Sequence, residues 1–143
     1  MAFAMLLLVA IVVGACTSSN DGVASRQTVT ATANALRLAS LGPLLLTMNN
    51  YGPEAVGAPY QRYVISAAIS PRDVLRQATA GLRSNGFRLK AGSDNGDATW
   101  VSAVHGQPVS VSVRVLSGGV RYGSVTVPVG RVGVDVEVIG RTL

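Results

Sequence analysis

Residues 109–115 read VSVSVRV, the most regular alternation in the chain. Successive side chains of a β-strand point to opposite faces, so this pattern predicts a strand with all four valines on one face. Such a face is typical of a sheet that packs on a core. The three polar residues, Ser110, Ser112 and Arg114, share the opposite face, and we take them as a candidate binding surface.

Weaker alternation predicts further strands on both sides of this one. The segments are 60–69, 87–90, 98–104, 120–127 with Gly123 as a bulge, and 132–138. Clusters of glycine and polar residues separate them, as is typical of the turns between antiparallel strands. His105-Gly106 is expected to be a two-residue hairpin turn, because that turn needs the positive φ that glycine adopts freely.

The clearest helix signals surround residues 71–85. Ser70 suits the N-cap, where its hydroxyl accepts an early backbone N–H. Pro71 suits the first helical position, where its missing N–H costs nothing. Asp73 favours the positive end of the helix dipole and can reach back to the cap. Together these residues predict that the helix begins at Pro71.

The end of this helix is marked as clearly as its start. Gly86 suits the left-handed position after a helix, and Phe87 is then expected to pack back on Leu82. Within the helix, apolar residues fall at spacings of one, four and eight positions, which makes one apolar stripe. The stripe consists of Val74, Leu75, Ala78 and Leu82.

These patterns predict an α+β domain over residues 60–143. One helix packs on a four- to five-stranded antiparallel sheet, and the helix stripe lies against the valine face in two layers. A domain of this size has a net stability of only a few kcal/mol. We therefore expect neighbouring apolar residues to help cover the sheet.

The region before this domain divides into two parts. Residues 16–35 are rich in Ser, Thr, Asn and Ala without apolar periodicity, and they are interpreted as a flexible tether. Residues 36–59 hold a leucine cluster, interrupted by Gly42-Pro43, and several turn signals. We expect this apolar and turn segment to pack on the domain, with 44–48 as a short strand or an extended stretch.

The chain begins with an apolar segment. Residues 5–13 are continuously apolar, and Gly14, Ala15 and the only cysteine, Cys16, follow. A transmembrane helix needs about 20 apolar residues, so this run is too short to span a membrane unaided. An apolar run that ends in small residues is typical of a secretory signal peptide, which we assign to residues 1–15.

Val13-Gly14-Ala15-Cys16 resembles the lipobox of bacterial lipoproteins, an aliphatic residue and two small ones before a cysteine. The resemblance covers residues 1–16. It implies that Cys16 receives a diacylglyceryl group, that the chain is cut between Ala15 and Cys16, and that membrane lipid holds the protein on the outer face of the cell membrane. Two acyl chains exceed the marginal hold of a single myristoyl group. The alternatives are an ordinary secretory signal, in which Cys16 has no role, and an uncleaved anchor.

The charge of the chain is modest, with 12 Lys+Arg, 7 Asp+Glu and a formal net charge of +5. The arginines are spread out and form no basic cluster of the kind that marks a nucleic-acid interface, so no nucleic-acid partner is expected. A mild positive field favours anionic lipid head groups or wall polymers. The same net charge is also what keeps a small domain soluble.

Residues for catalysis are few. A nucleophilic triad can be composed on paper from Ser102 or Ser110, His105, and Asp94 or Asp97, but no spacing selects one set and no G-x-S-x-G elbow is present. His105 is the only histidine, which excludes a multi-histidine metal site within one chain. We expect no catalytic site, no metal site and no cofactor.

Two acidic residues share one strand. Asp135 and Glu137 lie on the polar face of the 132–138 segment. Paired carboxylates can carry out acid–base chemistry, but two acids at this spacing are usually just the solvated side of a strand.

The sequence thus favours a membrane-anchored lipoprotein of the bacterial cell envelope. Its domain is expected to be a non-catalytic binding or accessory module whose partner is an envelope protein or an anionic wall polymer. The alternative is a secreted or envelope hydrolase with an unrecognised active site.

Overall fold

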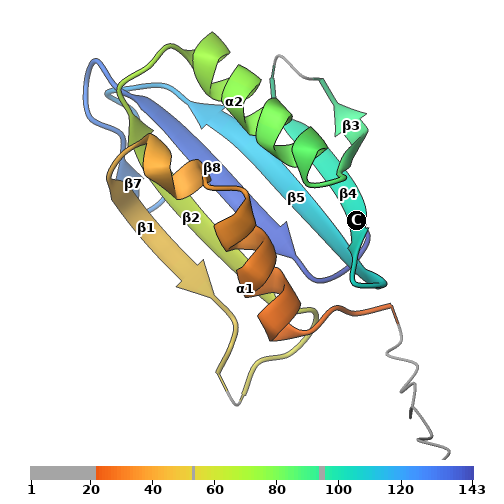
Figure 1. Cartoon of the computed structure of the whole chain (residues 1–143). Coiled ribbons are helices and arrows are strands. Elements are labelled where there is room, and N and C mark those ends of the chain that lie inside the picture. Colours follow the sequence, from red (N-terminus) through yellow and green to blue (C-terminus); the bar gives the residue numbers. More distant parts are fainter. Residues whose placement is uncertain (1–21, 53, 94–95) are drawn as a thin grey trace, which may run out of the picture.

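The computed structural model describes residues 22–52, 54–93 and 96–143 (Figure 1). It contains two α-helices, one short 3-10 helix and eight strands in those residues. In chain order they are α1 Arg26–Ala35, η1 Leu38–Leu41, β1 Leu44–Asn49, β2 Tyr60–Ala67, α2 Pro71–Ser84, β3 Arg88–Gly92, β4 Ala98–Val104, β5 Gln107–Leu116, β6 Arg121–Tyr122, β7 Val125–Thr126 and β8 Val132–Ile139.

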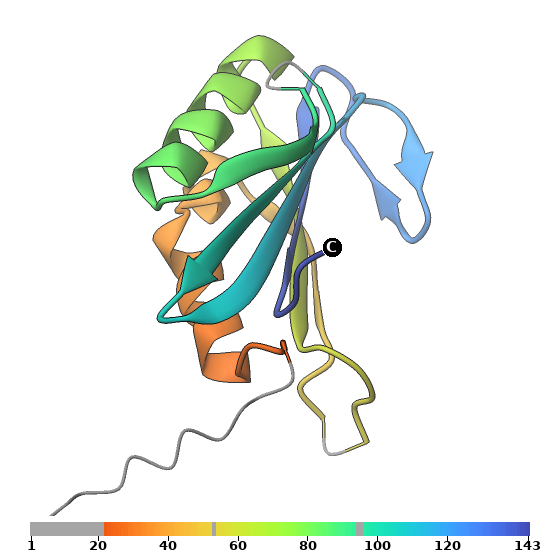
Figure 2. The same cartoon turned by 90° about the vertical axis from the view of Figure 1, so that its right-hand side faces the viewer.

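Six of the strands form one antiparallel sheet in the order β1-β2-β8-β5-β4-β3. Both α-helices cover one face of it, and the small β6–β7 hairpin stands on the other, which we call the open face (Figure 2). The predicted α+β class is therefore confirmed. The expected numbers of one helix and four to five strands were too low, because the described residues contain a second α-helix and a sixth strand in the main sheet.

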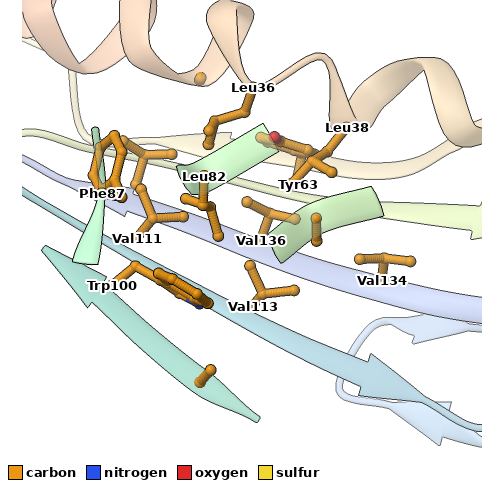
Figure 3. Close-up of a cluster of buried hydrophobic side chains, with 14 of the residues drawn as sticks. Leu36, Leu38, Tyr63, Leu82, Phe87, Trp100, Val111, Val113, Val134 and Val136 are labelled. Carbon is orange, nitrogen blue, oxygen red and sulfur yellow. The ribbon is translucent and has the colours of Figure 1, made fainter. Parts of the chain in front are cut away.

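The core lies between the helices and the valine face of the sheet. Val109 and Val111 of β5 are completely buried, and the α2 stripe ends on the equally buried Leu82. Figure 3 shows Leu82, Phe87 and Trp100 gathered with the valines of β5 and β8. The predicted contact between the helix stripe and the valine face is confirmed.

Helix α2 begins and ends as its sequence indicates. The Ser70 hydroxyl accepts from the Asp73 backbone N–H at 3.1 Å, and it also donates to the Asp73 carboxylate at 2.8 Å. At the other end Gly86 has φ of 79°, and the Phe87 N–H donates to the Leu82 carbonyl at 3.0 Å. This bond is the one expected where Phe87 folds back over the last turn. The predicted limits, 71–85, agree to within one residue.

Residues 26–35 were predicted to belong to the tether, and that prediction is wrong. They form α1, whose Val29 and Ala33 are buried in the core. Ser25 caps the helix by accepting from the Thr28 N–H. The pattern was missed because its inner face includes buried threonines, and β-branched residues have low helix propensity. Tertiary packing overrides that propensity here.

Because α1 belongs to the fold, the domain begins earlier in the sequence than predicted. Ala24 is buried, and its N–H donates to the Gly140 carbonyl at 2.7 Å, so the folded unit runs from about residue 24 rather than from 60. Residues 36–59 are not merely packed on the domain, since β1 is the edge strand of the main sheet and Leu38 enters the core. The predicted signal and the rest of the predicted tether, residues 1–21 with Cys16, lie outside the described residues.

The single strand predicted over 120–127 is also wrong. The segment folds into the β6–β7 hairpin, and Gly123, with φ of 61°, lies in its turn rather than at a bulge. Val125 and Val127 pack on Val64 at one end of the open face. The place beside β5 is taken by β8, whose longer alternation buries more valines. By contrast, the predicted turn at 105–106 is confirmed, with positive φ at both residues.

Candidate functional site

Polar side chains from four adjacent strands lie in a row across the open face. Thr99 of β4 stands opposite Ser112 of β5, Ser112 stands opposite Glu137 of β8, and Glu137 stands opposite Arg62 of β2. The two hydroxyls are 3.3 Å apart. Because facing residues on one side of an antiparallel pair have their Cβ atoms about 5 Å apart, these four side chains are direct neighbours.

The next row contains the best-formed ion pair of this face. Both terminal oxygens of Asp135 accept from Arg62, each at 2.8 Å, in a bidentate pair. The Asp135 side chain is 9% exposed and that of Arg62 is 38% exposed. The hydrogen bonds to Asp135, with the charges of Asp135 and Glu137 behind them, raise the pKa of Arg62. The two parallel hydrogen bonds fix the orientation of the Asp135 carboxylate against the planar guanidinium of Arg62.

Arg114 and Asp97 form a weaker pair at the rim. Their closest atoms are 3.4 Å apart, and both side chains are more than half exposed. Exposed pairs of this kind contribute little to stability, so both groups can exchange partners at low cost. Gly92 brings β3 close to Asp97, because any Cβ at Gly92 would collide with the Asp97 carbonyl.

Between these rows the open face has a hollow of about 160 Å³, which we call the polar hollow. Thr99, Ser112, Arg114 and the carboxylates Asp97, Asp135 and Glu137 contribute to its lining. Among the described residues, the three carboxylates and the guanidinium groups of Arg114 and of the adjoining Arg62 leave one negative charge in excess. Within the described residues the side-chain carboxylate of Glu137 accepts no hydrogen bond and forms no ion pair, although its charge acts on the neighbouring Arg62.

The structure separates the three residues of the predicted binding surface. Ser112 and Arg114 both line the polar hollow. Ser110 is completely buried, since its hydroxyl donates to the Arg141 carbonyl and accepts from the Leu143 N–H. The C-terminal residues therefore cover Ser110, and it cannot take part in an accessible surface.

Sequence reasoning missed most of the hollow. Asp135 was interpreted as part of a solvated strand side, but it is 7% exposed and paired with Arg62. The alternation did place Asp135 and Glu137 on the polar face. The alternation does not reveal the strand order. Only that order brings Arg62 next to Asp135, 73 positions further along the sequence.

The structure does not bring the residues of the hypothetical catalytic triad together, and several of them have other partners. Ser102 donates to the Gly86 carbonyl at 3.0 Å, and Asp97 is paired with Arg114. His105 is exposed in the β4–β5 turn, and in the described part of the chain no hydrogen bond joins it to a serine or a carboxylate. Asp94 lies outside the described residues.

A second hollow lies on the helical side of the sheet. It measures about 230 Å³ and is formed by α1, the end of α2 and the β4–β5 turn. Ala31, Phe87 and Val104 make it largely apolar, and His105 stands at it. It lacks the converging charged groups of the polar hollow, which therefore remains the better candidate.

The described residues hold neither a metal-binding cluster nor a membrane-spanning helix. No group of three or more His, Cys, Asp or Glu side chains is arranged to hold a metal ion in residues 22–52, 54–93 and 96–143. Among the helices within those same ranges, none has the length and apolar character needed to cross a bilayer.

Comparison with known proteins gives no assignment. No protein-family model, curated protein or solved structure matches the chain.

Proposed function

We propose that this protein is a bacterial cell-envelope lipoprotein, whose domain is a non-catalytic binding module held on the outer face of the cell membrane by acylated Cys16. The observation that carries the proposal is the sequence Val13-Gly14-Ala15-Cys16 after an apolar run too short to span a membrane. The folded domain begins only eight residues after Cys16. Anchor and domain are then directly joined, without a long tether.

The polar hollow is the binding site in this proposal, and a basic side chain of an envelope protein is its ligand. At about 160 Å³ the hollow is smaller than the roughly 300–1,000 Å³ of pockets for whole small ligands. It has room for one long side chain. The excess negative charge attracts an ammonium or guanidinium group and repels an anionic wall polymer.

Glu137 provides the main contact for such a group. Its carboxylate is half-buried at the hollow, unpaired within the described residues, and flanked by hydroxyl groups that can accept further N–H bonds. Asp97 is only weakly held by Arg114 and can turn to the ligand. A charged hydrogen bond to Glu137 is stronger than one between neutral groups.

The binding step is tested by titrating a chain of residues 22–143 with Nα-acetyl-lysine amide while amide chemical shifts are followed by NMR. We expect the largest shifts at Thr99 and Ser112, and a several-fold weaker response in Glu137→Gln. Glu54→Gln, which changes an exposed acid in the β1–β2 loop, is the matched control and leaves the titration unchanged. Equal shifts with Nα-acetyl-glutamate amide would show that charge does not select the ligand.

A further inference from the structure

The polypeptide enters the domain at one end of the sheet, which we call the anchor end. The Ala24 N–H donates to the Gly140 carbonyl, and the Gly140 N–H donates to the Pro59 carbonyl. Arg26, the first residue of α1, donates to the carbonyls of Tyr51 and Gly52 at 2.6 and 3.2 Å. The start of α1, the β1–β2 loop and the end of β8 therefore meet there, as Figure 2 also shows at the lower end of the molecule.

The short connection to Cys16 restricts which end can reach a membrane. Even fully extended, the eight residues from Cys16 to Ala24 span at most about 29 Å. The eight residues of β8 alone are about 26 Å long and lead from the opposite end to the anchor end. Contact by the opposite end would need the connection stretched almost to its limit along the domain. The anchor end needs no such stretching.

The chemistry of the anchor end suits a lipid surface. Val56, in the β1–β2 loop, is 92% exposed, which is the highest value among the exposed large apolar residues of the described chain. Among the described residues at the same end, Arg26 and Arg141 are exposed cations and Glu54 is an exposed acid. An exposed apolar side chain beside cations is the combination that binds the interface of a membrane with anionic lipids.

We propose that the anchor end rests on the membrane surface, with Val56 at the level of the lipid head groups and Arg26 and Arg141 facing anionic lipids. The proposal rests on the lipid anchor at Cys16 proposed above. It fixes the orientation of the polar hollow, which lies on the open face along the middle of the sheet, since Asp135 and Glu137 are the fourth and sixth of the eight residues of β8. The hollow then faces sideways above the membrane and stays accessible to a partner.

The test uses the full chain, produced in a bacterium and reconstituted in vesicles of zwitterionic and anionic phospholipid that carry nitroxide groups. Val56→Cys is labelled with an environment-sensitive thiol dye. Val129→Cys is the matched control, because Val129 is 87% exposed in the loop before β8, at the opposite end. Lipidation of Cys16 blocks the only natural thiol, so each variant takes up one dye. We expect several-fold stronger quenching of the dye at 56 than at 129.

The outcomes separate this proposal from the anchor itself. Equal quenching at both positions, or stronger quenching at 129, in a protein that floats with the vesicles overturns the orientation and leaves the anchor intact. A parental protein that takes up dye at Cys16 and does not float overturns the anchor, and the orientation with it. A further variant, Arg141→Gln, is expected to reduce quenching at 56 in anionic vesicles only, whereas Arg72→Gln, on α2, leaves it unchanged.

Discussion

Asp135 and Arg62 form one ion pair but differ in exposure, and that difference predicts different costs of removal. Arg62→Met leaves a carboxylate unpaired at 9% exposure and is expected to cost about 3 kcal/mol. Asp135→Asn leaves a guanidinium that water already reaches, and is expected to cost about 1 kcal/mol. Urea denaturation of the two variants measures both values.

Arg114 and Asp97 provide the control for that pair. Both side chains are more than half exposed, so Arg114→Met is expected to change the free energy of unfolding by less than about 0.5 kcal/mol. A cost for Asp135→Asn equal to or above that of Arg62→Met would contradict the asymmetric burial of the pair.

Tyr63 gives a prediction about pH. Its hydroxyl is buried and has no hydrogen-bond partner among the described residues. Burial raises the pKa of the Tyr63 phenol in the folded chain, so the folded chain keeps a proton that the unfolded chain loses. The resulting stability is complete below the ordinary pKa of about 10 and is lost as the pH rises above it toward the higher folded pKa.

Tyr63→Phe removes both the unsatisfied buried hydroxyl and the group with the raised pKa. At neutral pH the variant is expected to be as stable as the parent or more stable, by up to about 1 kcal/mol, since an unsatisfied buried hydroxyl is deleted. Between about pH 9 and pH 11 it is expected to lose less stability than the parent, because the shifted group is absent. Denaturation curves across this range measure the difference. An identical pH dependence in both proteins would show that Tyr63 is not buried in its neutral form.

At the scale of elements, α2 permits a direct comparison of capping with packing. Ser70→Ala removes the acceptor of the Asp73 N–H and is expected to cost about 1 kcal/mol. Leu82→Ala empties a completely buried site beside Phe87 and is expected to cost about 2–5 kcal/mol. Chemical denaturation gives the order, and the reverse order would mean that capping contributes more than packing.

Helix α1 is predicted to be indispensable for the folding of the domain. Its Val29 and Ala33 are buried, and burying one valine contributes about 1.5–3 kcal/mol. A chain that begins at residue 36 also exposes the parts of β2 and β8 beneath the helix. It is therefore expected to be unfolded, whereas a chain that begins at residue 22 unfolds cooperatively. Circular dichroism during heating distinguishes them, and equal midpoints would show that α1 is only an appendage.

The two helices show what could be predicted from the sequence at this scale. The limits of α2 were predictable because Ser70, Pro71 and Gly86 each have a local physical role that neighbouring residues cannot change. Helix α1 was not predictable, because its inner face mixes threonine and alanine with valine and its stability comes from the sheet beneath it. The valine strands were predictable because their alternation is regular. The hairpin at residues 121–126 was not, because its two strands have only two residues each and show no such pattern.

At the scale of the whole molecule, the polar hollow exists only through strand order. β8 lies between β2 and β5, so residues near the end of the chain separate two strands that precede it. Alternation places Ser112, Arg114 and Glu137 on polar faces, but it does not state which strands are neighbours. The sequence patterns therefore predict the polar character of the face, but they predict neither the hollow nor the Arg62–Asp135 pair.

The central claim is that Cys16 carries the lipid that holds this domain at the membrane. Intact-mass spectrometry of the protein from the bacterial membrane fraction tests it most directly, with Cys16→Ala as the matched variant. We expect the parent to have the mass of residues 16–143 plus a diacylglyceryl group, and Cys16→Ala to lack that group and retain residues 1–15. A membrane-bound parent of unmodified mass, or one that still carries residues 1–15, would contradict the claim.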